Sequence, residues 1–275
     1  MTFYFYDLET SGFNPRTARI MQFGGQRTDM DLKPIGQPSD ILIKLDEDIL
    51  PDPDAILVTG ITPQKTLAKG ISEAEFMKIF SSEIATSDTI FVGFNNVRFD
   101  DEFMRFLHYR NFYDAYEWQW KDGRGRWDLL DTARMTRALR PEGIKWPVNS
   151  EGIQTNNLGD IAILNKLSIA NAHDALSDAL TTIELARLLK NNQPKLFDYL
   201  LKMRKKENIA KLVKSGKPII YTSGKYPSEF EKTTVVSVIA NHPERQGVLV
   251  YDLRIDPRQF ENMSKIGRAS CRERV

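Results

Sequence analysis

The order of β-favouring and helix-favouring segments constrains this chain more than any other feature. Segments rich in aromatic and β-branched residues come first, and amphipathic helical segments dominate later. The aromatic run Phe3–Tyr6, which ends at Asp7, predicts a central strand. Ile20–Thr28 and Ile41–Leu45 predict two more strands, joined through turn residues at 34–36. This order is typical of a layered α/β domain.

Helix signals follow along the chain. Thr62-Pro63 and the capping box from Ser72 to Glu75 each mark a helix start. We expect a strand at Thr89–Phe94 and helices at Asp101–Arg110, Leu129–Leu139, Leu158–Lys166 and Asp174–Leu189. In the last of these helices, Leu176, Leu180, Ile183 and Leu188 are the expected core-facing residues.

A domain boundary is predicted at residues 191–194, where turn-prone residues precede Pro194. Beyond it we expect one helix at Lys195–Lys214. Runs of β-branched residues at Ile219–Thr222, Val235–Ala240 and Gly247–Asp252 then predict strands of a small barrel or sheet. The predicted domains are therefore residues 1–192 and 193–265. Residues 266–275 lack apolar periodicity, so we expect a non-native or disordered tail there.

Composition excludes several classes of protein. With 41% hydrophobic and 27% charged residues, the chain has the make-up of a globular protein. No run of 18 apolar residues predicts a membrane span, and the N-terminus lacks a signal-peptide pattern. The single cysteine, Cys271, forms no internal disulfide and no zinc cluster. We expect a cytoplasmic protein.

The net charge of +1 conceals an asymmetry between the two regions. Residues 1–194 carry 21 basic and 28 acidic residues, a balance of −7, whereas residues 195–275 carry 17 and 9, a balance of +8. The first region could hold cations and the second a polyanion. The alternative interpretation is two solvated surfaces whose net charges differ by chance, without any bound ion or polyanion.

Three acidic segments carry the candidate chemistry. Asp7 and Glu9 are two residues apart after the aromatic strand, so both side chains lie on one face, where a divalent cation would offset their repulsion. Asp100 follows the strand Thr89–Phe94; it could approach the same sheet edge, with Asp101 capping the helix, or be a helix cap itself. Asp178 falls in the first turn of a helix capped by Asp174.

His173 lies just before that helix, where an imidazole could reach a water molecule. Its ordinary pKa near 6.5 suits a general base. A surface histidine without a role is the alternative interpretation.

The ordered set Asp7, Glu9, Asp100, His173 and Asp178 resembles the DEDDh family of 3′→5′ exonucleases. Longer motifs are similar to the bacterial exodeoxyribonuclease I family over about residues 3–260. They are Asp-Leu-Glu-Thr (7–10), Leu-Val-Thr-Gly-Ile-Thr-Pro-Gln (57–64), Phe-Asn-Asn-Val-Arg-Phe-Asp-Asp-Glu (94–102), Tyr-Arg-Asn-Phe-Tyr-Asp (109–114), Arg-Trp-Asp-Leu-Leu-Asp (126–131), Leu-Arg-Pro-Glu-Gly-Ile (139–144) and Asn-Ala-His-Asp-Ala (171–175). The resemblance implies a ribonuclease-H-like exonuclease domain with a mixed central sheet, then an incomplete SH3-like β domain in a C-terminally truncated member.

The same resemblance implies a function and a set of site residues. It implies hydrolysis of single-stranded DNA to nucleoside 5′-monophosphates in DNA repair, with two Mg²⁺ ions, replaceable by Mn²⁺, at the four carboxylates. His173 would accept the proton of the attacking water. The substrate contacts it implies are Glu9, Arg105, Tyr116, Trp120, Arg134, Asn157 and His173. A monomer that meets the single-stranded-DNA-binding protein is also expected, with that contact weakened by truncation.

One departure concerns the pair Asn156-Asn157, where the family commonly has an aromatic and a basic residue. Asn157 can hydrogen-bond a phosphate but does not neutralise it, so weaker binding of the terminal nucleotide is expected. Two other functions stay open: an RNA-trimming exonuclease with the same five residues, and a non-catalytic module that binds single-stranded nucleic acid.

Overall fold

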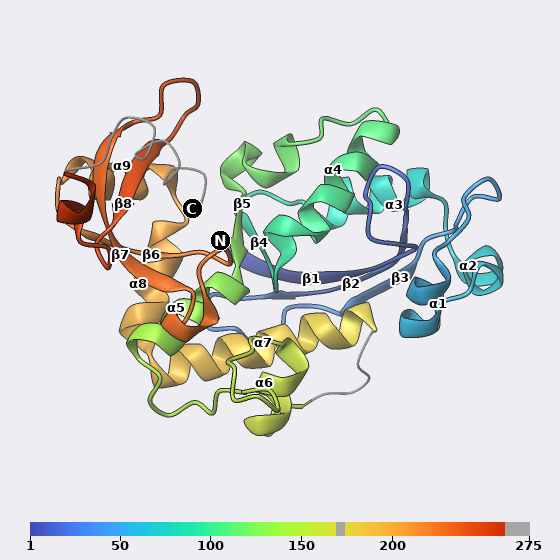
Figure 1. The fold of residues 1–275 in the computed structure, drawn as a ribbon. Coiled ribbons are helices and arrows are strands. Elements are labelled where there is room, and N and C mark those ends of the chain that lie inside the picture. Colours follow the sequence, from blue (N-terminus) through green and yellow to red (C-terminus); the bar gives the residue numbers. More distant parts are fainter. Residues whose placement is uncertain (169–173, 262–275) are drawn as a thin grey trace.

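A five-stranded mixed sheet forms the centre of the computed structural model, which describes residues 1–168 and 174–261. Its strands are β1 (Thr2–Thr10), β2 (Ile20–Thr28), β3 (Ser39–Leu42), β4 (Thr89–Gly93) and β5 (Gly125–Asp128). They lie in the order β3-β2-β1-β4-β5 (Figure 1). β2 is antiparallel to β1 and β3, whereas β1, β4 and β5 run parallel. The expected central position of the aromatic strand is confirmed.

Helices cover both faces of this sheet (Figure 1). One face packs against α3 (Glu73–Ile79), its π-helical continuation Phe80–Ile84 and α4 (Asp100–Arg110); the other packs against α5 (Leu129–Leu139), α6 (Leu158–Leu164), α7 (Ala175–Asn192) and α8 (Pro194–Met203). α1 (Pro53–Thr59) and α2 (Pro63–Lys69) lie near β3. β1 serves both cores, because Tyr4 and Tyr6 face α4 while Phe3 and Phe5 face α7.

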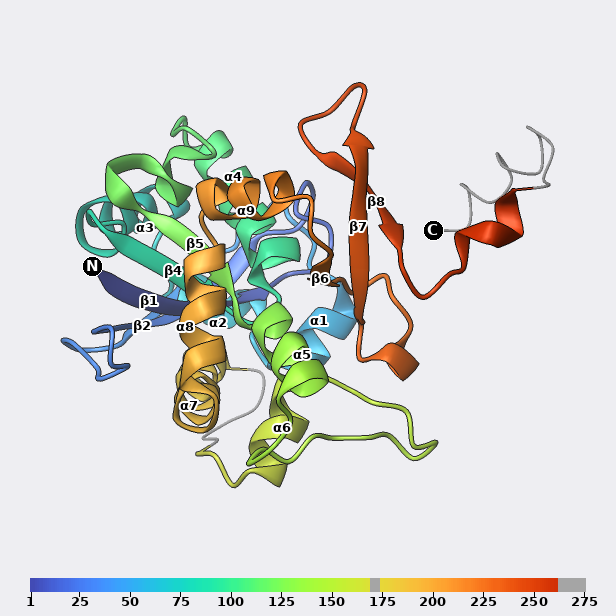
Figure 2. The same cartoon turned by 90° about the vertical axis from the view of Figure 1, so that its left-hand side faces the viewer.

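The second region holds α9 (Lys206–Lys214) and an antiparallel sheet in the order β6-β7-β8. Its strands are β6 (Ile219–Thr222), β7 (Thr233–Asn241) and β8 (Val248–Asp252). They stand apart from the large sheet in Figure 2. A groove of about 950 Å³ separates the two regions and is lined mainly by apolar residues of α5, α8, α9 and the small sheet.

The expectation of one helix over Lys195–Lys214 is wrong. The chain turns between α8 and α9, where Lys205 is extended and precedes the first turn of α9. α8 packs Phe197 against Trp127 of the core on that face of the large sheet, with ring centroids 5.0 Å apart, whereas Ile209 and Leu212 of α9 face the groove. One straight helix could not satisfy both surfaces.

The expected core stripe of α7 is also partly wrong. Ile183 is buried and Leu188 packs against the same core, but Leu180 is 37% exposed and Leu176 is only partly buried. The buried face is instead rich in small residues, among them Ala175, Ala179 and Ala186. Small side chains let the helix axis approach the sheet closely, which large leucines would prevent.

Among the helices of the described residues, none has both the length and the apolar character needed to cross a bilayer. The tail at residues 266–275 lies outside the described residues.

Candidate active site

β1 brings two carboxylates to the face covered by α7. The strand continues to Thr10, beyond its expected end, because it pairs with β2 from Phe3 as far as Thr10. Asp7 lies opposite Gly24, and Glu9 lies opposite Gln22. Since side chains alternate along a strand, both carboxylates share the face of Phe3 and Phe5. On its other edge, β1 pairs with β4 only as far as Phe5, so the edge beside Asp7 is open to the segment that follows β4.

α7 delivers the third carboxylate. Asp174 caps the helix by accepting the backbone N–H of Ser177 at 3.0 Å, so Asp178 stands in the first turn as expected. The first turn lies directly on β2, where a Cβ atom on Gly24 would be 2.1 Å from the Leu176 nitrogen. Glycine is therefore required opposite Asp7, because any larger residue would push the helix away.

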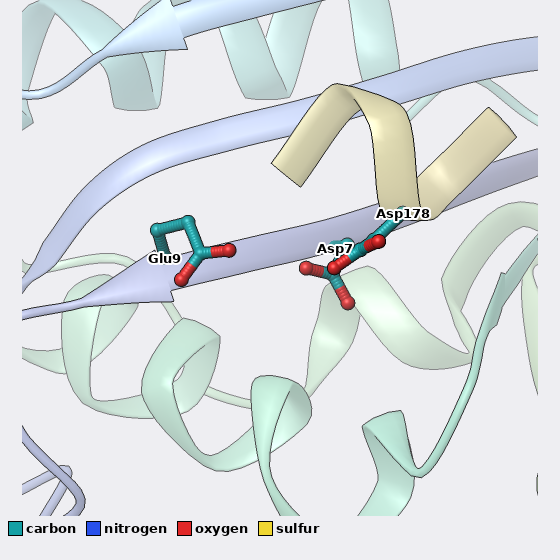
Figure 3. A group of neighbouring side chains, drawn as sticks. All are labelled: Asp7, Glu9 and Asp178. Carbon is teal, nitrogen blue, oxygen red and sulfur yellow. The ribbon is translucent and has the colours of Figure 1, made fainter. Parts of the chain in front are cut away.

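Asp7, Glu9 and Asp178 form one group of potential metal ligands. Each offers a carboxylate oxygen, and these three oxygens lie within 4.8 Å of one another. Figure 3 shows Asp7 and Asp178 adjacent, with Glu9 farther along β1 and its carboxyl directed toward them.

Asp100 is the fourth carboxylate, buried at the start of α4. It stands outside the group of three, but among neighbouring charges its effect on the pKa of Asp7 is the largest. Its Oδ1 atom is buried and has no hydrogen-bond partner. The structure therefore places a buried, incompletely satisfied carboxylate next to the group. The expectation that Asp101 caps α4 is wrong: Phe99 precedes the first turn, without a side-chain cap.

Burial and mutual repulsion raise the pKa of these acids. The pKa of Asp7 lies well above its ordinary value because of burial first and then the charges of Asp100, Asp178 and Glu9. Burial, with Asp178 and Asp174, raises the pKa of Glu9 to about 7. Burial is also the main reason why the pKa of Asp100 rises to about 8. Without a cation, holding these groups ionised costs free energy.

This donor set fits a hard divalent cation. Mg²⁺ prefers oxygen ligands and in proteins often takes only one or two carboxylates together with substrate phosphates. A bound cation would compensate the charge of Asp7, Glu9 and Asp178 and would offer the unpartnered Oδ1 of Asp100 an electrostatic partner. Among the described residues, the group offers only carboxylate oxygens, which are hard ligands.

Two of the predicted substrate contacts lie together. The Arg105 guanidinium stacks over the Tyr116 ring, 5.2 Å from its centroid, and donates a hydrogen bond to Gln119 Oε1 at 3.1 Å. Tyr116 and Trp120 are both exposed. Tyr116 and Gln119 thus hold the Arg105 side chain in place, and the rings of Tyr116 and Trp120 are exposed to solvent.

Arg134 and Asn157 have structural partners of their own. Arg134 donates to Asp131 Oδ1 at 2.8 Å on α5. Asn157 Oδ1 accepts the backbone N–H of Asp160 at 3.1 Å and so caps α6. Its amide oxygen is therefore already used within the protein.

His173 lies outside the described residues, but the neighbouring Asp174 is held firmly. Gln22 donates to Asp174 Oδ2 at 3.0 Å and accepts the Ala175 backbone N–H at 3.3 Å. Reasoning from sequence missed Gln22, because its position opposite Glu9 depends on strand register. It also missed Phe13, which is 80% exposed at the end of β1 and touches the Phe99 ring. An aromatic residue shortly after the two acids was the available signal for Phe13.

Comparisons with known proteins place the chain in a family. Residues 4–186 match the family model described as Exonuclease, and residues 204–268 match the Exonuclease I SH3-like domain. Exodeoxyribonuclease I of Escherichia coli (strain K12) is 44% identical over 258 residues, which cover 93% of this chain and 54% of that protein. The chain thus spans about half the length of this relative.

Solved structures show the same similarity. A crystal structure of E. coli exonuclease I in complex with a dA16 oligonucleotide has a TM-score of 0.93 at 42% identity, covering 100% of this chain and 58% of that one. The zinc-ion-bound form of the E. coli exonuclease I complex with single-stranded DNA has a TM-score of 0.88 at 41% identity, covering 97% and 60%. These matches confirm the resemblance drawn from the motifs and the fold expected from it. The chain belongs to the exonuclease family and joins an exonuclease domain to an exonuclease I SH3-like domain.

Proposed function

We propose that this chain carries the catalytic site of a Mg²⁺-dependent 3′→5′ exonuclease that degrades single-stranded DNA to nucleoside 5′-monophosphates. The observation that carries the proposal is the convergence of Asp7 and Glu9 from β1 with Asp178 from α7, close to the buried Asp100. The chain spans about half the length of its relatives. The activity known for the full-length relatives is therefore proposed, and not shown, for this chain.

In this proposal the four carboxylates hold the cations and the protein positions the water and the DNA end. Two bound Mg²⁺ ions would stabilise the attacking and leaving oxygens of an in-line displacement at the terminal phosphodiester. Asp7 would hold a cation together with Glu9 and Asp178, whose ligand atoms lie within 4.8 Å of its own, and Asp100 acts on it most strongly among the charges. His173, next to the fixed Asp174, accepts a proton from the attacking water.

Single-stranded DNA is the proposed substrate because the surface offers stacking faces and cations. The exposed rings of Tyr116, Trp120 and Phe13 could each stack on a base, which contributes about 1–3 kcal/mol per base. Arg105 and Arg134 would add phosphate contacts, and residues 195–275 contribute a balance of +8. Asn157 caps a helix and carries no charge, so we expect weaker binding of the terminal nucleotide.

Two alternatives are decided by one assay. Single strands labelled at the 5′ end and single strands labelled at the 3′ end, both as DNA and as RNA, are incubated with Mg²⁺ or with a chelator. We expect metal-dependent shortening of DNA from the 3′ end. Faster shortening of RNA would favour an RNA-trimming enzyme, and binding without shortening would favour a nucleic-acid-binding module. A role in DNA repair, a contact with the single-stranded-DNA-binding protein and a monomeric state stay predictions.

The proton-accepting role of His173 has its own test. His173→Ala is expected to lower kcat by roughly 10²- to 10⁴-fold, the usual contribution of a general base, with Mn²⁺ binding retained. Single-turnover kinetics measure the chemical step directly. An unchanged single-turnover rate would show that another group accepts the proton.

A further inference from the structure

A second acidic side chain of α4 is buried on the opposite side of β1 from Asp7. Asp101 is 0% exposed. Its Oδ1 accepts hydrogen bonds from the Tyr6 hydroxyl at 2.5 Å and from Asn96 Nδ2 at 3.3 Å. Its Oδ2 accepts a hydrogen bond from Arg126 Nη1 at 2.6 Å. The carboxylate is therefore fixed by three donors from three separate segments.

The position of these donors in the sequence connects them to the proposed metal ligands. Tyr6 is the residue before Asp7 on β1, and Asp101 is the residue after Asp100 on α4. Asn96 belongs to the segment that leads from β4 into α4. It packs closely on Gly93, because a Cβ atom added to Gly93 would lie 2.6 Å from the Cβ atom of Asn96. β1 and β4 are not paired beyond Phe5 and Val92. Beyond that point, the Asp101 carboxylate links β1 to the segment after β4 through its hydrogen bonds with Tyr6 and Asn96, in place of backbone pairing.

Two ordinary explanations account for Asp101 incompletely. It is not the helix cap, since Phe99 occupies that position. Its ion pair with Arg126 is also weak evidence that Asp101 stabilises the fold, because the free energy of removing both charges from water offsets much of their attraction. A comparable pair joins α4 to α3 at the other end of the helix, where Arg110 Nη2 lies 2.6 Å from Glu73 Oε1. That pair lies far along α4 from Asp100 and serves as a matched control.

We propose that Asp101, through Tyr6 and Arg126, is a positioning residue that holds Asp100 against Asp7 for cation binding. The inference rests on the proposed function, since it assigns Asp7 and Asp100 to the cation site. Residues that orient metal ligands typically contribute 10- to 100-fold to metal affinity or activity when they are lost. A small displacement of a ligand has this effect because the cation requires near-ideal geometry.

The test compares Asp101→Asn with Glu73→Gln in the full chain. Mn²⁺ affinity is measured without DNA by electron paramagnetic resonance of free Mn²⁺, and kcat and KM are measured on a single-stranded oligonucleotide. We expect Asp101→Asn to weaken Mn²⁺ binding and to lower kcat by about 10- to 100-fold each, with KM unchanged. Glu73→Gln is expected to change neither Mn²⁺ affinity nor kcat, even if it lowers the unfolding midpoint as much as Asp101→Asn does.

Tyr6→Phe provides a second variant that removes only one hydroxyl and keeps the buried ring. It is expected to weaken Mn²⁺ binding about tenfold, and it carries the test if Asp101→Asn does not fold. Mn²⁺ affinities of Asp101→Asn and Tyr6→Phe equal to that of Glu73→Gln would overturn the inference, as would a wild-type protein that binds no Mn²⁺. A wild-type protein that binds Mn²⁺ but cleaves no DNA would instead contradict the proposed function alone, since the comparison of affinities still tests Asp101.

Discussion

The two sheets of this protein differ in how completely they are covered. The five-stranded sheet is packed on both faces, and its central strand is buried from Phe3 to Tyr6. The three-stranded sheet leaves large apolar side chains open, including Ile239 at 65% exposure. The charges differ too, with −7 in residues 1–194 and +8 in residues 195–275. The covered sheet therefore holds repelling carboxylates at fixed distances, whereas the positive charge of the chain is concentrated in residues 195–275.

The largest effect expected from this comparison is on chemistry. Asp7→Asn removes the carboxylate flanked by Glu9 and Asp178 while keeping its size. We expect kcat to fall on the order of 10³-fold or more, since a metal supplies several kcal/mol of charge stabilisation to the transition state. Binding of single-stranded DNA in chelator, measured by fluorescence anisotropy, should be nearly unchanged. Asp54→Asn, on the exposed surface of α1, is the control, and retained turnover in Asp7→Asn would refute the metal assignment.

The next effect concerns acid stability of the covered region. His108 is buried between Phe80 and Trp118, and burial lowers its pKa to about 4. Below about pH 6.5 the unfolded chain binds a proton that the folded chain does not, so stability should fall as pH drops from 6.5 toward 4, by up to about 3 kcal/mol.

Denaturant titrations of wild type and His108→Gln across this range isolate the contribution of this histidine. The raised pKa values of Asp7, Glu9 and Asp100 act in the opposite direction, but they are common to both proteins. We expect a shallower loss of stability on acidification in His108→Gln. Parallel curves for the two proteins would show that His108 takes up its proton as readily in the folded state as in the unfolded state.

A smaller effect is expected at the contact between β2 and α7. Gly24→Ala places a methyl group where the Leu176 nitrogen leaves no space, so overpacking should cost about 1–3 kcal/mol and shift Asp178 from Asp7. Mn²⁺ affinity should fall with it. Gly247→Ala in the second region, where nothing lies within 4 Å of the added atom, is the matched control. Equal unfolding midpoints and equal Mn²⁺ affinities for the two variants would contradict the packing argument.

The smallest effect is expected from two exposed lysines at the start of α9, Lys205 and Lys206. Lys205→Gln with Lys206→Gln should weaken DNA binding and reduce the salt dependence of the binding constant by up to about 0.7 in log–log slope per lost phosphate contact. Saturated kcat should be unchanged. Lys33→Gln with Lys78→Gln, in exposed positions of the first region, controls for the loss of two charges. The same change in slope for both pairs would show that the second region has no special part in binding.

The parts of the fold that local signals specify were predictable. β2 and α5 have the bounds expected from their apolar patterns, and Asp174 caps α7 as its side chain suggested. The parts that depend on distant contacts were not. Gly24 against Leu176 and the turn between α8 and α9 arise from packing between segments far apart in the chain.

The same distinction holds within the candidate site. Asp7 and Glu9 could be paired from spacing, because the strand period puts both side chains on one face. The cap at Asp174 placed Asp178 in the first turn of its helix, and the resemblance to the family joined it to the pair. The Gln22–Asp174 contact and the donors around Asp101 could not be predicted, since strand register and the path of a loop determine them. The catalytic roles of these residues stay predictions.

The claim at the centre of this account is that carboxylates from β1 and α7 hold a divalent cation. Anomalous diffraction from crystals soaked in Mn²⁺ tests it most directly. We expect a Mn²⁺ peak within coordination distance of Asp7 and of at least one other carboxylate among Glu9, Asp100 and Asp178. Saturating Mn²⁺ that leaves this group without a peak, or that binds only elsewhere on the protein, would contradict it.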